Sequence, residues 1–201
     1  MTQRSKILLS GFDAFGKLHR NTSQAIVEAI IATQTSGSIL YSAILPTSYE
    51  RSFVTLSALI TELQPDFIVM LGVASSSQDI RIEQQAHNRL STKIEDNDGY
   101  VPQAPYISAS ACDVLHTAVD TKKLQATLAN QKQHCVISED CGDYVCNFLY
   151  YNVLSDIKEK QLSSKALFVH VPHILDGRLN EQAEFDSLTK SIKHILLTFT
   201  E

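Results

Sequence analysis

The stretch DFIVMLG, residues 66–72, decides the fold class. It holds five consecutive apolar residues between Asp66 and Gly72, so both faces of the strand that it predicts must be covered by protein. A strand covered on both faces is typical of a mostly parallel sheet with helices on either side. The flanking sequence agrees, because short apolar runs alternate with longer amphipathic segments along the chain.

This alternation predicts strands and helices in turn. Strands are expected over residues 6–10, 38–45, 66–72, 79–90, 134–138 and 166–171, helices over 22–32, 48–63, 122–131, 143–158 and 181–199, and a long ordered loop over 91–112. Polar residues alternate within 79–90, which favours an edge strand or a hairpin there. Together these elements predict an α/β protein with one domain over residues 1–201, whose functional groups follow the carboxyl ends of strands.

Composition and charge narrow the class of protein and of partner. The chain has 201 residues with 17 basic and 22 acidic side chains, a net charge of −5, so we expect no affinity for nucleic acid or for an anionic membrane. No apolar run approaches the roughly 18–20 residues of a membrane span, and the apolar stretch after Lys6 is too short for a signal peptide. Four cysteines are too few for a disulfide scaffold. We therefore expect a cytoplasmic protein.

The segment GFDAFGK, residues 11–17, directly follows a predicted strand. It matches seven positions of the phosphate-binding loop, but Leu18 stands where a magnesium-binding hydroxyl is needed, and Asp13 would repel phosphate. Nucleotide binding is therefore disfavoured. Two interpretations stay open: the phenylalanines pack into the core, or Phe12 and Phe15 wall a small apolar pocket.

The segment CGDYVCN, residues 141–147, places Cys146 in the first turn of a predicted helix. Free backbone amides and the helix dipole at that position lower the pKa of a thiol and can bind a developing oxyanion. Cys146 is therefore a candidate nucleophile. The alternative is a buried, inert cysteine, which is a common role for this residue.

Two further segments supply the partners that a thiol nucleophile needs. In FVHVPH, residues 168–173, His170 lies near the end of a buried strand, on the same rim as Cys146 if the sheet is parallel, and histidine suits a general base. In IRIEQQAHN, residues 80–88, Glu83 interrupts an apolar alternation and could orient that histidine. The alternatives are a structural histidine and a solvated edge-strand charge. His170 and His173 have no metal-binding spacing.

Taken together, these segments resemble the pyroglutamyl peptidase I family, also called pyrrolidone-carboxylate peptidases. The family's motifs G-F-x-P-F-G-G, I-E-R-x-A-x-N, D-N-x-G, S-N-x-A-G-x-Y-x-C-N and F-x-H-x-P match residues 11–17, 82–88, 96–99, 138–147 and 168–172. The resemblance implies a three-layer α/β/α sandwich around a twisted, mostly parallel, mixed sheet. It also implies a homo-oligomer, a dimer or a tetramer.

The resemblance implies a function and a set of site residues. Glu83, Cys146 and His170 would be the catalytic triad of a cysteine peptidase that cleaves the amide bond after an N-terminal pyroglutamyl (5-oxoproline) residue through a thioester. Its substrates would be peptides with that N-terminus, and it would need no metal or organic cofactor. The residues expected to bind substrate are Phe12, Phe15, Asn21, Thr47, Lys93, Ile94, Tyr144 and Val145, with Lys93 helping to hold the oxyanion.

The chain departs from the family pattern close to the expected substrate. The departures are Ala14, Lys17, the stretch 74–77, Gln84, Lys93, Glu139 and Cys141. The Glu139 carboxylate would disfavour a thiolate nearby, and a Cys141–Cys146 disulfide that acts as an oxidative lock is a further hypothesis. Two rival functions follow from these departures: a cysteine amidase for another small acyl or lactam group, and a non-catalytic binding protein on the same scaffold.

Overall fold

The computed structural model describes residues 4–16, 19–33, 39–174, 177 and 180–199. Lys17, Leu18 and Ser38, which enter the predictions, lie outside the described residues. Within the described part of the chain, no helix is long and apolar enough to cross a membrane.

A six-stranded mixed sheet forms the centre of the molecule, in the order β2-β1-β3-β8-β4-β7. Its strands are β1 (Lys6–Phe12), β2 (Ile39–Leu45), β3 (Phe67–Val73), β4 (Ile80–Glu83), β7 (Cys135–Ser138) and β8 (Lys165–Val171). Strands β2, β1, β3 and β8 are parallel, whereas β4 is antiparallel to β8 and β7 is parallel to β4. A separate antiparallel pair joins β5 (Gln85–His87) to β6 (Val114–His116).

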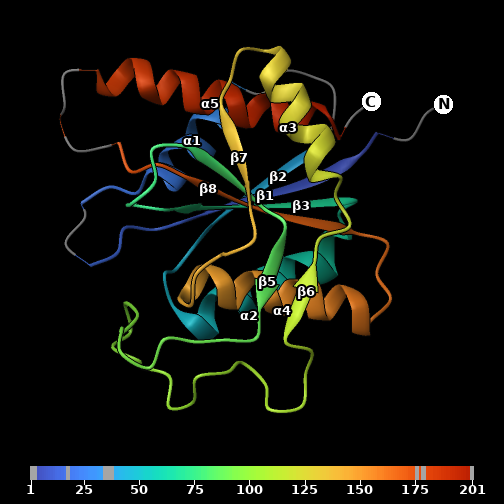
Figure 1. Ribbon diagram of the computed structural model, residues 1–201. Helices are drawn as coiled ribbons and strands as arrows, with labels where there is room; N and C mark the ends of the chain where they lie inside the picture. The colour runs from blue at the N-terminus through green and yellow to red at the C-terminus, as the bar shows by residue number, and fades with distance from the viewer. Residues whose placement is uncertain (1–3, 17–18, 34–38, 175–176, 178–179, 200–201) are drawn as a thin grey trace.

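Helices cover both faces of the sheet, which confirms the three-layer α/β/α fold (Figure 1). One face carries α1 (Thr22–Ala32), α3 (Thr121–Asn130) and α5 (Glu181–Leu197), and the other carries α2 (Tyr49–Leu63) and α4 (Val145–Glu159). Sequence patterns located these helices well because side chains cap several of them. The side chains of Asn21, Ser48 and Asp120 accept hydrogen bonds from the first turns of α1, α2 and α3.

The prediction for residues 79–90 was wrong. The stretch divides into two strands, and β4 lies inside the sheet between β8 and β7 rather than at an edge. Its polar alternation includes a buried carboxylate, that of Glu83, and does not mark a solvated face. The hairpin-like pairing belongs to β5, whose partner β6 was not predicted because three residues carry too little pattern.

Because β1 packs closely against α1, any side chain at Gly11 would clash with the backbone of α1. A Cβ atom at Gly11 would lie 2.8 Å from the backbone oxygen of Ser23, and a backbone atom cannot move aside cheaply. We expect Gly11→Ala to lower the free energy of unfolding by about 1–3 kcal/mol in urea denaturation. Gly16→Asn is the control: Gly16 has a φ of +61° with no atom near its Cβ position, a conformation that asparagine tolerates, so its stability should change by less than about 0.5 kcal/mol. Equal losses in the two variants would refute the packing explanation.

Candidate active site

The alternation of side chains along three adjacent strands brings the candidate residues to one face of the sheet. Met70 and Phe168 pack in the core on the α4 side, so Gly72 and His170, two residues further along β3 and β8, face α4 as well. On β4, Ile82 packs in the opposite core, so Glu83 also faces α4. Sheet pairing then sets Gly72 beside His170, and Arg81 of β4 on its other side.

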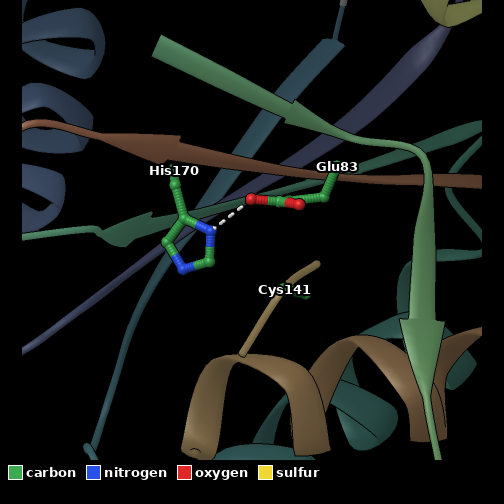
Figure 2. Close-up of side chains that lie close together, drawn as sticks. All are labelled: Glu83, Cys141 and His170. Carbon is green, nitrogen blue, oxygen red and sulfur yellow. Dashed lines mark hydrogen bonds and ion pairs between the residues drawn. The ribbon is translucent and has the colours of Figure 1, made fainter. Parts of the chain in front are cut away.

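Glu83 and His170 form a buried hydrogen-bonded pair (Figure 2). The Nδ1 atom of His170 lies 2.8 Å from Oε1 of Glu83, with side-chain exposures of 7% and 0%. A carboxylate can only accept, so Nδ1 carries the proton and Nε2 is left as the basic nitrogen. Arg81 supports the pair, because its Nε lies 3.3 Å from the same carboxylate oxygen. The structure therefore brings together the predicted base and the predicted orienting residue.

Cys146 lies in the first turn of α4, as predicted, with its sulfur against the sheet. A Cβ atom at Gly72 would lie 2.9 Å from Sγ of Cys146, so the missing side chain of Gly72 makes the space that the sulfur occupies. Because Gly72 pairs with His170 across β3 and β8, the thiol and the imidazole lie on the same face over neighbouring strands. The three residues predicted as a triad therefore gather in one place.

The route by which Cys146 reaches this place differs from the prediction. The sequence placed His170 and Cys146 on one rim on the condition that the strands before them are parallel, and this condition is not met. Instead β7 runs opposite to β8, and its last residue, Ser138, pairs with Glu83 and so lies level with Phe168. The chain then turns through Gly142, whose φ is +84°, before α4 begins under the sheet.

The pKa of the Cys146 thiol is raised, whereas the sequence predicted that it would be lowered. Burial, and next the negative charge of Glu83, raise the pKa of Cys146 to about 12, although its backbone amide acts in the other direction. Burial thus outweighs the helix N-terminus. The carboxylate that opposes ionisation is Glu83 and not Glu139, whose side chain is exposed. The Cys146 thiol is therefore protonated at neutral pH.

A second thiol, Cys141, lies beside the Glu83–His170 pair (Figure 2). Its Sγ, a carboxylate oxygen of Glu83 and a ring nitrogen of His170 all lie within 4.8 Å of one another, and all three residues are buried. The four cysteines of the chain are free thiols. The sequence singled out Cys141 only for its proximity to Cys146, and nothing in the pattern of residues placed it next to Glu83.

Two residues that the sequence reasoning passed over hold the site together. Asn147 is fully buried; its Oδ1 accepts from the His87 amide at 2.9 Å, and its Nδ2 donates to the carbonyls of His87 and Arg89 at 2.8 and 3.0 Å. The Tyr150 hydroxyl donates to the Glu83 carbonyl at 3.0 Å. These bonds fix the start of α4 to β5 and to the end of β4. The adjacency of Asn147 to Cys146 was the one available signal.

Aromatic side chains near Cys146 fit the predicted apolar pocket in part. The rings of Phe15 and Tyr144 have centroids 6.1 Å apart, and the Tyr144 hydroxyl donates to the Glu95 carbonyl at 2.9 Å. This bond ties the 91–112 loop, with its half-exposed Ile94, to the start of α4. Phe12 and Val145, by contrast, are buried in the core on the α4 side.

The polar groups of Asn21 and Thr47 are engaged by the protein itself. Asn21 caps α1 through Oδ1, and its Nδ2 donates to the Asp13 carbonyl at 2.8 Å. The Thr47 amide donates to Oδ1 of Asp13 at 2.7 Å, and its hydroxyl donates to the Asp13 carbonyl at 3.2 Å. Both residues therefore fix the loop after β1. Lys93 is exposed on the 91–112 loop.

A separate cavity of about 650 Å³ opens between α2 and the 91–112 loop. It is lined by Tyr49, Leu90, Tyr100, Tyr106 and Phe148 among others, and by none of the predicted substrate-binding residues. Tyr49 stands between this cavity and Tyr144, with ring centroids 5.6 Å apart. The cavity is therefore distinct from the space in front of Cys146.

Comparison with known proteins agrees with this geometry. The family model described as pyroglutamyl peptidase matches residues 5–196. The pyrrolidone-carboxylate peptidase of Thermococcus onnurineus is 30% identical over 188 residues, which cover 94% of each chain, and that of Bacillus subtilis is 26% identical over 198 residues, covering 97% of this chain and 92% of the relative.

Solved structures give the same result. The crystal structure of pyroglutamyl peptidase I from Bacillus amyloliquefaciens superposes with a TM-score of 0.89 at 27% identity, covering 98% of this chain and 96% of that chain. The pyrrolidone carboxyl peptidase of Fervidobacterium islandicum has a TM-score of 0.88 at 30% identity, covering 96% and 97%. The fold, the sequence and the arrangement of the site agree: this chain belongs to the pyroglutamyl peptidase family.

Proposed function

We propose that this protein is a cysteine peptidase that hydrolyses the amide bond after an N-terminal pyroglutamyl residue. The observation that carries the proposal is the buried hydrogen bond between Glu83 and His170 on the sheet face that also receives the Cys146 sulfur. The family and the named relatives support the choice of substrate.

The raised pKa of Cys146 determines how the reaction begins. Because the resting thiol is neutral, His170 accepts its proton at Nε2 as the sulfur attacks the pyroglutamyl carbonyl. Glu83 accepts from Nδ1–H, which fixes the ring and stabilises the imidazolium that forms. The Cys146 amide, free in the first turn of α4, faces the developing oxyanion.

The second half of the reaction reverses these proton transfers. The imidazolium of His170 protonates the departing amine, and a thioester remains on Cys146. His170 then takes a proton from water as that water attacks the thioester, and it returns the proton to the Cys146 sulfur as the C–S bond breaks and 5-oxoproline leaves. The resting thiol is restored without a metal or an organic cofactor taking part.

The substrate ring is small, flat and uncharged, and it suits a site with aromatic walls. We place it against Phe15 and Tyr144, with Phe12 and Val145 behind them and Ile94 at the rim. Asn21 and Thr47 hold the loop that carries Phe15. We place Lys93, which is exposed on the 91–112 loop, at the entrance. An ordinary charged N-terminus would lose hydration there without gaining a partner, so the site rejects it.

We further propose that residues 1–201 act as one domain and that the protein works as a homo-oligomer in the cytoplasm. The two cores share a single sheet, which supports one folding unit. The oligomer and the location rest on the resemblance to the family.

Release of a fluorescent amine from its pyroglutamyl amide tests the activity. Cys146→Ala should lower kcat/KM by at least roughly a thousandfold, because no other group replaces the nucleophile. Cys112→Ala is the matched control and should keep full activity, since Cys112 is exposed and belongs to none of the segments that form the site. If the reduced wild-type protein does not cleave the pyroglutamyl amide but cleaves the amide of another small acyl or lactam group, the proposed substrate is wrong and the protein is a related amidase.

Glu83→Gln should move two measurements in opposite directions. Turnover should fall by at least about 100-fold because His170 loses the carboxylate that orients it. Alkylation of Cys146 by iodoacetamide should instead become faster at a given pH, because the charge of Glu83 raises the pKa of that thiol. The control is Glu139→Gln, whose exposed carboxylate should affect neither rate.

The wild-type alkylation rate adds a pH readout to the same experiment. Iodoacetamide reacts with the thiolate, and a pKa far above neutral means that the thiolate fraction rises about tenfold per pH unit over the neutral and mildly alkaline range. A rate that does not change with pH would reveal a thiolate–imidazolium pair formed before substrate binds, and would contradict the neutral-thiol mechanism.

Gly72→Ala tests whether the space beside His170 positions the nucleophile. The added methyl group would lie 2.9 Å from Sγ of Cys146 and 2.8 Å from the ring of Phe168. We expect kcat/KM to fall about tenfold or more as the sulfur is displaced, while Gly16→Asn leaves it unchanged. Full activity in Gly72→Ala, measured on protein with a wild-type unfolding curve, would show that the thiol has freedom to move.

A further inference from the structure

Glu83 carries a buried oxygen that the catalytic role leaves unused. Its Oε1 accepts from His170 and faces Arg81, but Oε2 is inaccessible to solvent and has no hydrogen-bond partner among the described residues. Leaving a buried carboxylate oxygen unsatisfied costs free energy, so such an atom calls for a ligand or an explanation.

The unsatisfied carboxylate belongs to a cluster of three potential metal ligands. Cys141 offers a sulfur, His170 a ring nitrogen and Glu83 an oxygen, and these atoms lie within 4.8 Å of one another on three separate segments of the chain (Figure 2). Sulfur, imidazole nitrogen and carboxylate oxygen in a compact group suit tetrahedral Zn²⁺, with bonds of about 2.0–2.3 Å. Mg²⁺ and Ca²⁺ need only oxygen ligands and do not fit.

We propose that Glu83, Cys141 and His170 bind Zn²⁺ reversibly, with the fourth position left to water, and that the bound ion switches the enzyme off. Cys141 gives its thiol proton to solvent and binds as the thiolate, Glu83 binds through its carboxylate, and His170 binds as neutral imidazole. The ion withdraws both members of the Glu83–His170 pair from proton transfer. This second consequence rests on the proposed function; the binding itself does not.

Cys141 makes this site a property of this chain rather than of the family motif. In the pattern S-N-x-A-G that matches the segment before Cys146, alanine precedes the glycine, and here Cys141 precedes Gly142. Cys141→Ala removes the sulfur ligand and leaves the three residues of the proposed triad in place.

Cobalt binding tests the site without any assay of activity. Co²⁺ replaces Zn²⁺ in such sites and gives a sulfur-to-metal charge-transfer absorption band. In reduced Cys146→Ala protein, which lacks the nucleophilic thiol, we expect the band to saturate at one ion per chain. It should vanish in Cys141→Ala/Cys146→Ala and persist in Cys112→Ala/Cys146→Ala. A band that survives the loss of Cys141, or none in Cys146→Ala, would overturn the proposal.

Inhibition by buffered Zn²⁺ tests the consequence. Wild-type turnover should be lost with Zn²⁺ and restored by EDTA. Cys141→Ala should need at least about tenfold more Zn²⁺ for half inhibition, because the loss of a direct ligand lowers metal affinity at least as much as the loss of a group that supports a ligand. Equal sensitivity of the two proteins would place the ion on Cys146 and His170 alone and refute the site. If no pyroglutamyl substrate is turned over, the proposed function fails while the cobalt titration still decides the binding.

Discussion

The buried hydrogen bond between Glu83 and His170 is the interaction on which the rest of the site depends. A carboxylate with no exposed surface is costly unless it is paired, and here His170 and Arg81 supply the pairing from either side. The register of β4 against β8 places the two side chains on one face, because Arg81 pairs with His170 and Glu83 lies two residues further along β4. Strands β4 and β7 both run opposite to β8, and the pairing of β4 with β8 brings the carboxylate to the histidine.

Placing the nucleophile against this pair requires several segments to agree. Gly72 leaves room for the sulfur, and Gly142 turns the chain back after β7. Asn147 fixes the start of α4 through two hydrogen bonds to His87 of β5 and one to Arg89 just after it. The loops around the site are tied in the same way. The buried carboxylate of Asp96 accepts from three backbone amides and Asn97 donates to the Ala14 carbonyl, so the 91–112 loop is held over the loop after β1.

Sequence reasoning succeeded where a pattern is long or a residue has a local role. The helices were found through their periodicity and caps such as Asn21, and β3 through its uninterrupted apolar run. It failed where the answer depends on contacts distant in sequence. The direction of β4, the burial of Glu83 and the three-residue strand β6 follow from sheet pairing, which no local pattern records. Motifs singled out the three candidate residues of the triad, but they did not reveal the raised pKa of Cys146, because burial depends on the whole fold.

The same burial explains how two thiols coexist beside one histidine. Burial, and next the charge of Glu83, raise the pKa of Cys141 far above its usual range, so at neutral pH it stays protonated and is no rival nucleophile. Cys146 has a raised pKa too, but it lies half-buried at the start of α4, whereas Cys141 is buried. The two thiols therefore differ in exposure more than in the direction of their pKa shifts. A bound metal ion would change the protonation state of Cys141, because it stabilises the thiolate directly and does not require the sulfur to be exposed in the free protein.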